Sequence, residues 1–105
     1  MLDETSAGQT ICEAIAFHRL LRLVTTDGDR IELEPHCFGL GADGRSLLLG
    51  WSTSPMKNRN TSPVDWIFCG LHQIRELEIL DGSFKGPRRK YASVKKQIRR
   101  VYCEI

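Results

Sequence analysis

The sequence predicts a small, mainly β domain with one N-terminal helix and five or six short strands. The helical spacing of apolar residues stops near His18, and alternating or short continuous apolar stretches follow it. Glycine-containing turns separate these stretches, and the length of 105 residues suits one domain. Short strands joined by tight turns indicate a small barrel or a strongly twisted sheet.

One helix is expected at about residues 11–19. Thr10 and Glu13 have the spacing of a capping box, which marks a helix start. The preceding residues, 1–9, are expected to form a flexible leader. The helical face that should dock on the sheet carries Ile11, Ala14, Ile15 and His18.

The first two strands are expected at residues 21–26 and 31–34. Between them, Gly28 can supply the positive φ that a tight hairpin turn needs. Residues 31–34 alternate apolar and acidic side chains, as a half-buried strand does. Pro35 should end or bend this strand because proline has no N–H to donate.

The rest of the chain is expected to complete one domain, residues 10–105. A second turn should lie at 42–44, and residues 52–63 form the one long loop, which is polar and of a kind that is often functional. A turn-like basic stretch should occupy residues 82–91, with a short helix at 92–98. Further strands are expected at 46–51, 64–71, 74–80 and 101–105.

Composition indicates a soluble protein of the cytoplasm without a metal or cofactor. No apolar run is long enough to cross a membrane, and the acidic N-terminus is unlike a secretory signal. The four cysteines have no metal-site spacing and are expected to be reduced thiols. They are Cys12, Cys37, Cys69 and Cys103.

Charge is divided unequally along the chain, although the net charge is only +2. Residues 1–84 hold more acids than bases, whereas the basic segment at 85–100 holds eight Lys and Arg residues and no acid. An acidic body and a basic C-terminal segment suggest two surfaces with different partners. The alternative is that the basic segment folds over the acidic body, with Glu32, Glu34, Glu76 and Glu78 as its counter-charges.

A family resemblance appears in the order of several short stretches. These are Ala14-Ile15 with Arg19-Leu20, Glu34-Pro35-His36 with Gly39, Leu47-Leu48-Leu49-Gly50, Leu71-His72-Gln73-Ile74, Leu77-Glu78-Ile79-Leu80, and Phe84-Lys85-Gly86-Pro87-Arg88 with Tyr91. In this order they resemble the stand-alone WYL-like domains of bacteria over about residues 10–105. Ser46-Leu47-Leu48 stands where many members carry the WYL tripeptide.

The resemblance implies an Sm-like or SH3-like β-barrel with a leading helix and a non-enzymatic role. WYL domains usually accompany DNA-binding regulators or defence proteins, where they sense nucleotides or single-stranded nucleic acid. His36 and Arg88 keep family-like positions. Ile31, Ile67 and Gln73 occupy or adjoin positions where arginine is common in the family.

Binding candidates come from the basic segment, the tryptophans and the histidines. Arg88 and Arg89, which follow Pro87, could bind phosphate through their planar forks, or could form structural salt bridges. Trp51 and Trp66 could form an aromatic platform or belong to the core edge. The remaining candidates for contact with an anionic ligand are His36, Arg45, His72, Lys90 and Tyr91, with hydrogen-bonded structural roles as the alternative for the histidines.

Catalysis has little support in the sequence. Cys37 follows His36 directly, but neighbours on a strand point to opposite faces and cannot form a nucleophile–base pair. No hydrolase, nucleotide-phosphate or metalloprotease motif occurs. Two hypotheses therefore stand: a sensing module for a nucleotide or single-stranded nucleic acid, and a protein-interaction subunit that pairs as a homodimer or with a partner regulator.

Overall fold

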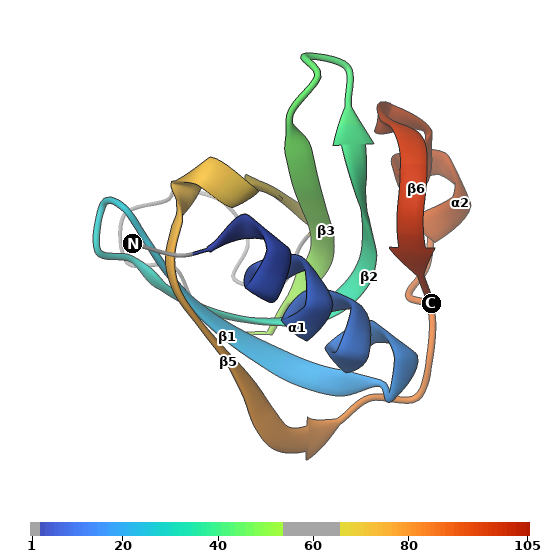
Figure 1. Ribbon diagram of the computed structural model, residues 1–105. Coiled ribbons are helices and arrows are strands. Elements are labelled where there is room, and N and C mark those ends of the chain that lie inside the picture. The colour runs from blue at the N-terminus through green and yellow to red at the C-terminus, as the bar shows by residue number, and fades with distance from the viewer. Residues whose placement is uncertain (1–2, 54–65) are drawn as a thin grey trace.

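The computed structural model describes residues 3–53 and 66–105, which form six strands, one long helix and short helical turns. All strand pairs are antiparallel, and the sheet order is β4-β3-β2-β1-β5, with β6 paired to β2 (Figure 1). The mainly β class with an N-terminal helix is confirmed. Within the described residues the sheet curls without hydrogen bonds between its end strands β4 and β5.

Helix α1, Glu4–Ala16, begins well before the predicted position. Its N-cap is Asp3, whose carboxylate accepts the backbone N–H of Ser6 at 3.2 Å, and Thr10 lies inside the helix. The expectation of a flexible leader is therefore wrong from Glu4 onward. An aspartate three residues before a helical N–H caps as well as the expected threonine does.

Strands β1, Arg19–Thr25, and β2, Arg30–Gly41, form the predicted hairpin, with Gly28 at φ 90° in its turn. Strand β2 continues through Pro35, and its register against β3 shifts between Pro35 and Cys37. Proline therefore bends this strand instead of ending it. The first half of β2 pairs with β1 and the second half with β6, so β2 joins the two parts of the sheet.

The middle strands follow the sequence pattern closely. Strand β3 spans Ser46–Ser52 and β4 spans Trp66–Gly70, after which a 3-10 turn, Leu71–Gln73, leads into β5, Ile74–Ser83. The predicted long loop lies outside the described residues apart from its first two positions, which are Ser52 at the end of β3 and Thr53.

The C-terminal segment forms a short helix α2, Tyr91–Val94, a 3-10 turn, Lys95–Gln97, and strand β6, Ile98–Glu104. The helix is shorter and the strand longer than predicted. Helix α1 packs on one face of the curled sheet, and one side of the helix lies beside β6 (Figure 1). The core between them includes Ile11, Ile15, Leu21, Leu23, Leu33 and Leu48.

Cysteine pairing corrects one expectation from the sequence. Cys12 of α1 and Cys103 of β6 form a disulfide, whereas Cys37 and Cys69 are buried free thiols. The sequence separation of the pair is 91 residues, so only the packing of α1 beside β6 reveals it. None of the described helices is long and apolar enough to span a membrane.

Candidate functional site

Most of the predicted site residues converge on His36, in the middle of β2. The ring of His36 is fully buried, and Trp66, Tyr91 and Phe84 surround it with centroid distances of 4.8, 5.3 and 5.6 Å. In the sequence, Phe84 stands out only as part of a stretch that carries the family resemblance. Its contact with His36 depends on the long-range path of the segment after β5, which local pattern does not disclose.

Hydrogen bonds determine the protonation state of His36. The backbone N–H of Arg88 donates to Nε2 at 3.0 Å, so this nitrogen carries no proton. Nδ1 therefore holds the proton and donates it to the carbonyl oxygen of Glu34 at 2.8 Å. Burial lowers the pKa of His36, which agrees with a neutral ring whose two nitrogens are both occupied.

Arg88 is neutralised by the protein's own acidic body. Its Nε and Nη2 groups donate to the two carboxylate oxygens of Glu34 at 2.8 and 2.7 Å, and its guanidinium carbon lies 5.4 Å from the centre of a Trp51 ring. The Glu34 side chain is only 6% exposed, and the hydrogen bonds to it raise the pKa of Arg88. This arrangement is the structural salt bridge that the sequence analysis left as an alternative.

The two tryptophans lie at the core edge. Trp51 and Trp66 meet edge to face at 5.2 Å, and Trp66 Nε1 donates to the carbonyl of Arg89 at 3.1 Å. Trp51 Nε1 is buried without a hydrogen-bond partner among the described residues. Both rings are half-buried, and Arg88 covers part of Trp51, so these residues fit the core-edge interpretation better than an open platform.

Tyr91 is also held internally. Its hydroxyl donates to Glu104 at 2.8 Å, and Lys95 donates to the same carboxylate oxygen at 2.9 Å. Burial raises the pKa of Tyr91, and the hydrogen bond from Lys95 lowers the pKa of Glu104. We call His36, Trp51, Trp66, Arg88 and Tyr91, with Glu34, the His36 cluster.

A surface hollow of about 520 Å³ opens beside the His36 cluster. Its walls come from Glu34 and from the segment after β5, including Phe84, Lys85 and Arg88. The described residues include no group of three or more His, Cys, Asp or Glu side chains able to hold a metal ion.

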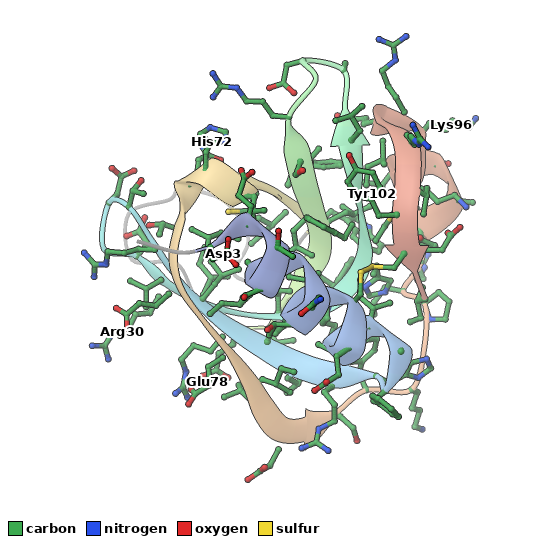
Figure 2. The ribbon with its side chains drawn as sticks, viewed as in Figure 1. Asp3, Arg30, His72, Glu78, Lys96 and Tyr102 are labelled. Carbon is green, nitrogen blue, oxygen red and sulfur yellow. A yellow bond between two sulfur atoms is a disulfide. The ribbon has the colours of Figure 1, made fainter. Side chains whose placement is uncertain are left out.

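Arg45 and His72 lie away from this cluster, whereas Lys90 adjoins it in the chain. Arg45, after the β2–β3 turn, and His72, in the 3-10 turn, line a separate hollow of about 250 Å³. Figure 2 labels His72 at that turn, apart from β6. Lys90 is exposed with φ 67° at the start of α2.

A second region of the basic segment remains available to solvent. Lys96, Arg99 and Arg100 are exposed, and no carboxylate among the described residues forms an ion pair with them. Lys96 lies in the 3-10 turn before β6, and Tyr102, on β6 with Arg99 and Arg100, is 50% exposed. We call Lys96, Arg99, Arg100 and Tyr102 the β6 surface.

Comparisons with protein-family models, with curated proteins and with solved structures find no match. The side chains of the two regions are therefore the basis for inferring function. In the His36 cluster, Nε and Nη2 of Arg88 and both ring nitrogens of His36 are already paired. On the β6 surface, the three cations have no carboxylate partner among the described residues, and the ring of Tyr102 is half exposed.

Proposed function

We propose that this chain is a non-enzymatic binding module that recognises a nucleotide or single-stranded nucleic acid through its basic C-terminal segment. The observation that carries the proposal is the β6 surface, where Lys96, Arg99 and Arg100 accompany the exposed ring of Tyr102. Lysine and arginine contact phosphates and release counterions, and aromatic rings stack on unpaired bases. This combination suits a single strand better than a duplex, whose bases are already stacked.

The resemblance to WYL-like domains supports the same function. The order of helix, hairpin and later strands agrees with what that family leads us to expect, and its members bind ligands without catalysis. We also propose that the chain catalyses no reaction. Arg88, although it keeps a family-like position, contributes in this proposal to the stability of the fold through Glu34.

A charge-reversal experiment tests the proposal. The double variant Lys96→Glu/Arg100→Glu should weaken binding of a fluorescent single-stranded oligonucleotide and reduce the slope of log K against log salt by about 0.7 for each lost phosphate contact. Fluorescence anisotropy at several salt concentrations measures both quantities. The matched control, Arg30→Glu/Arg75→Glu, makes the same change in net charge on exposed residues outside the basic segment.

Binding that falls equally in both variants would reflect net charge alone and would contradict a specific surface. Absence of oligonucleotide binding by the unmodified protein at low salt would refute the proposed function altogether. Thermal unfolding of each variant verifies that the substitutions leave the protein folded.

A protein-interaction role is the second candidate. Among the described residues, β6 pairs along one edge only, with β2, and it exposes Val101, at 38%, beside Tyr102. An end strand with an exposed apolar side chain can pair with another chain. Light scattering distinguishes the two roles: a monomer at high concentration, with no partner recovered, would count against this candidate.

The proposal includes a cytoplasmic location, where nucleic-acid ligands occur. Cytoplasmic thiols are generally kept reduced, so the Cys12–Cys103 bond is the feature of the molecule that we expect to respond to redox conditions there. Alkylation of free thiols in rapidly quenched cells, followed by mass spectrometry, measures the fraction of this pair that is oxidised.

A further inference from the structure

A shallow, open groove of about 380 Å³ runs along α1, on a different part of the surface from the His36 cluster, and Tyr102 of β6 forms part of its far side. Phe38, Leu71 and Cys12 supply apolar lining. The rings of Phe38 and Tyr102 meet at 5.6 Å with an interplanar angle of 61°. Because Tyr102 touches Phe38 at this angle and stays half exposed, ring surface remains open for a planar group.

Close approach of α1 shapes the floor of the groove. A Cβ atom added to Gly8 would lie 3.3 Å from the Phe38 ring, so glycine lets the helix pass directly over this ring. The Cys12–Cys103 disulfide then joins the helix to the strand that carries Tyr102, as Figure 2 shows. The two sides of the groove are therefore held at a constant separation by a covalent bond.

Two arginines outside the lining of the groove lie near it. On β2, Phe38 and Leu40 point to the same side of the sheet, and Leu40 pairs with Arg100, which places Arg100 on the side of the groove. The hollow lined by Arg45 and His72 shares Glu4, Ser46 and Leu71 with the groove, so these two hollows adjoin. An anionic backbone could thus pass between Arg45 and Arg100.

Of the residues that the structure describes, Glu4 is the one acidic residue in the lining of the groove. A carboxylate repels phosphate but accepts hydrogen bonds from an exocyclic amino group, as carboxylates do with cytosine in nucleic-acid complexes. The combination of an aromatic ring, an apolar floor, one acceptor and flanking cations matches an unpaired base with its phosphates on either side.

We propose that the groove along α1 receives one unpaired base of a single-stranded nucleic acid, stacked on Tyr102. This inference rests on the proposed function and names the base-binding site that function needs. Arg45 and Arg100 contact the phosphates that flank the base. Stacking tolerates different bases, so the site selects single strands over duplexes more than it selects sequence.

The experiment compares two single-stranded oligonucleotides of about ten nucleotides with the same phosphate charge, one bearing bases and one abasic. The unmodified protein should bind the base-bearing strand about 5- to 160-fold more tightly, since stacking contributes about 1–3 kcal/mol per base. Tyr102→Ala should remove this preference without changing the salt slope, and Tyr102→Phe should retain it. Phe17→Ala is the control, because Phe17 is an aromatic residue at 71% exposure at the other end of α1.

A second variant tests the groove without removing Tyr102 from its contact with Phe38. Gln9 is exposed and lines the groove, so Gln9→Trp should fill it and weaken binding of the base-bearing strand alone. Ala16→Trp places the same side chain at an exposed position on α1 outside the lining and should have no effect.

The possible results separate the two proposals. Equal binding of both strands, with salt dependence retained and Tyr102→Ala without effect, would overturn the base site and leave the proposed function intact. No binding of either strand would refute both. A homodimer in light scattering that Gln9→Trp dissociates would assign the groove to a second copy of the chain and overturn the inference.

Discussion

Arg88 and Arg100 belong to the same basic segment, but the structure surrounds them differently. Arg88 donates twice to a nearly buried carboxylate and lies over Trp51. Arg100 projects from β6, where no carboxylate among the described residues pairs with it. The His36 cluster and the β6 surface thus use the same type of side chain, one for internal neutralisation and one for contact with solvent.

The difference shows that the charge of a segment does not identify the cations that are free to bind a partner. A carboxylate in the position of Glu34 is costly to bury alone, so it needs a cation with good hydrogen-bonding geometry. Arg88 meets that need, and Lys95 pairs with Glu104. Lys96, Arg99 and Arg100 have no acidic partner among the described residues. Which cations can reach a ligand therefore depends on which acids lie within reach of each one.

The largest expected effect on stability comes from removing the disulfide that joins α1 to β6. Cys12→Ser/Cys103→Ser should lower the free energy of unfolding by about 4–5 kcal/mol, because the disulfide closes a loop with a sequence separation of 91 residues. Urea denaturation measures this change. Both tryptophans belong to the His36 cluster, so their fluorescence in the folded state should stay the same while the groove beside β6 loosens.

A folded-state tryptophan spectrum that shifts in the double serine variant would show that the two regions are coupled. Addition of a dithiol reductant to the unmodified protein provides the chemical equivalent. It should reproduce the loss of stability and leave the serine variant unchanged.

A smaller effect is expected from removing each arginine. Arg88→Ala should cost about 2–3 kcal/mol, less than the loss of a fully buried pair because the Arg88 side chain is 47% exposed. Arg100→Ala should change stability by no more than about 0.5 kcal/mol, as surface substitutions usually do. Thermal or urea unfolding measures the loss of stability in each variant. Equal losses for Arg88→Ala and Arg100→Ala would contradict the difference between the two regions.

The smallest expected effect is a pH dependence confined to the His36 cluster. The folded-state pKa of His36 is lowered by burial, so the unfolded chain binds a proton more readily. Stability is therefore present in full above about pH 6.5, the ordinary histidine value, and is lost as the pH falls through the folded-state pKa.

Melting temperatures between pH 8 and pH 5 measure this loss. His36→Gln should flatten the curve in that range, because its side chain does not titrate, even if the variant is less stable overall. His72→Gln, at an exposed position, should keep the pH dependence of the unmodified protein. A steep curve retained in His36→Gln would assign the dependence to other groups.

Much of the sheet could be predicted from the sequence because its signals are local. Gly28 and Gly44, with φ of 90° and 81°, lie in the expected turns, and the alternation at 31–34 matches β2. The predicted helix start is wrong because Asp3 and Thr10 are both good N-cap residues. The choice between them depends on whether Ala7 is buried when the first turns of α1 form.

The sequence by itself determined the mainly β class, the helix before it and the concentration of cations after Phe84, since periodicity, turn residues and charge are properties of neighbouring positions. Only the tertiary structure decided that Cys12 forms a disulfide with Cys103, that Glu34 pairs with Arg88 and that Tyr102 is half exposed beside a groove. These contacts join residues far apart in the chain, and their free energy comes from burial and distances that exist only after folding.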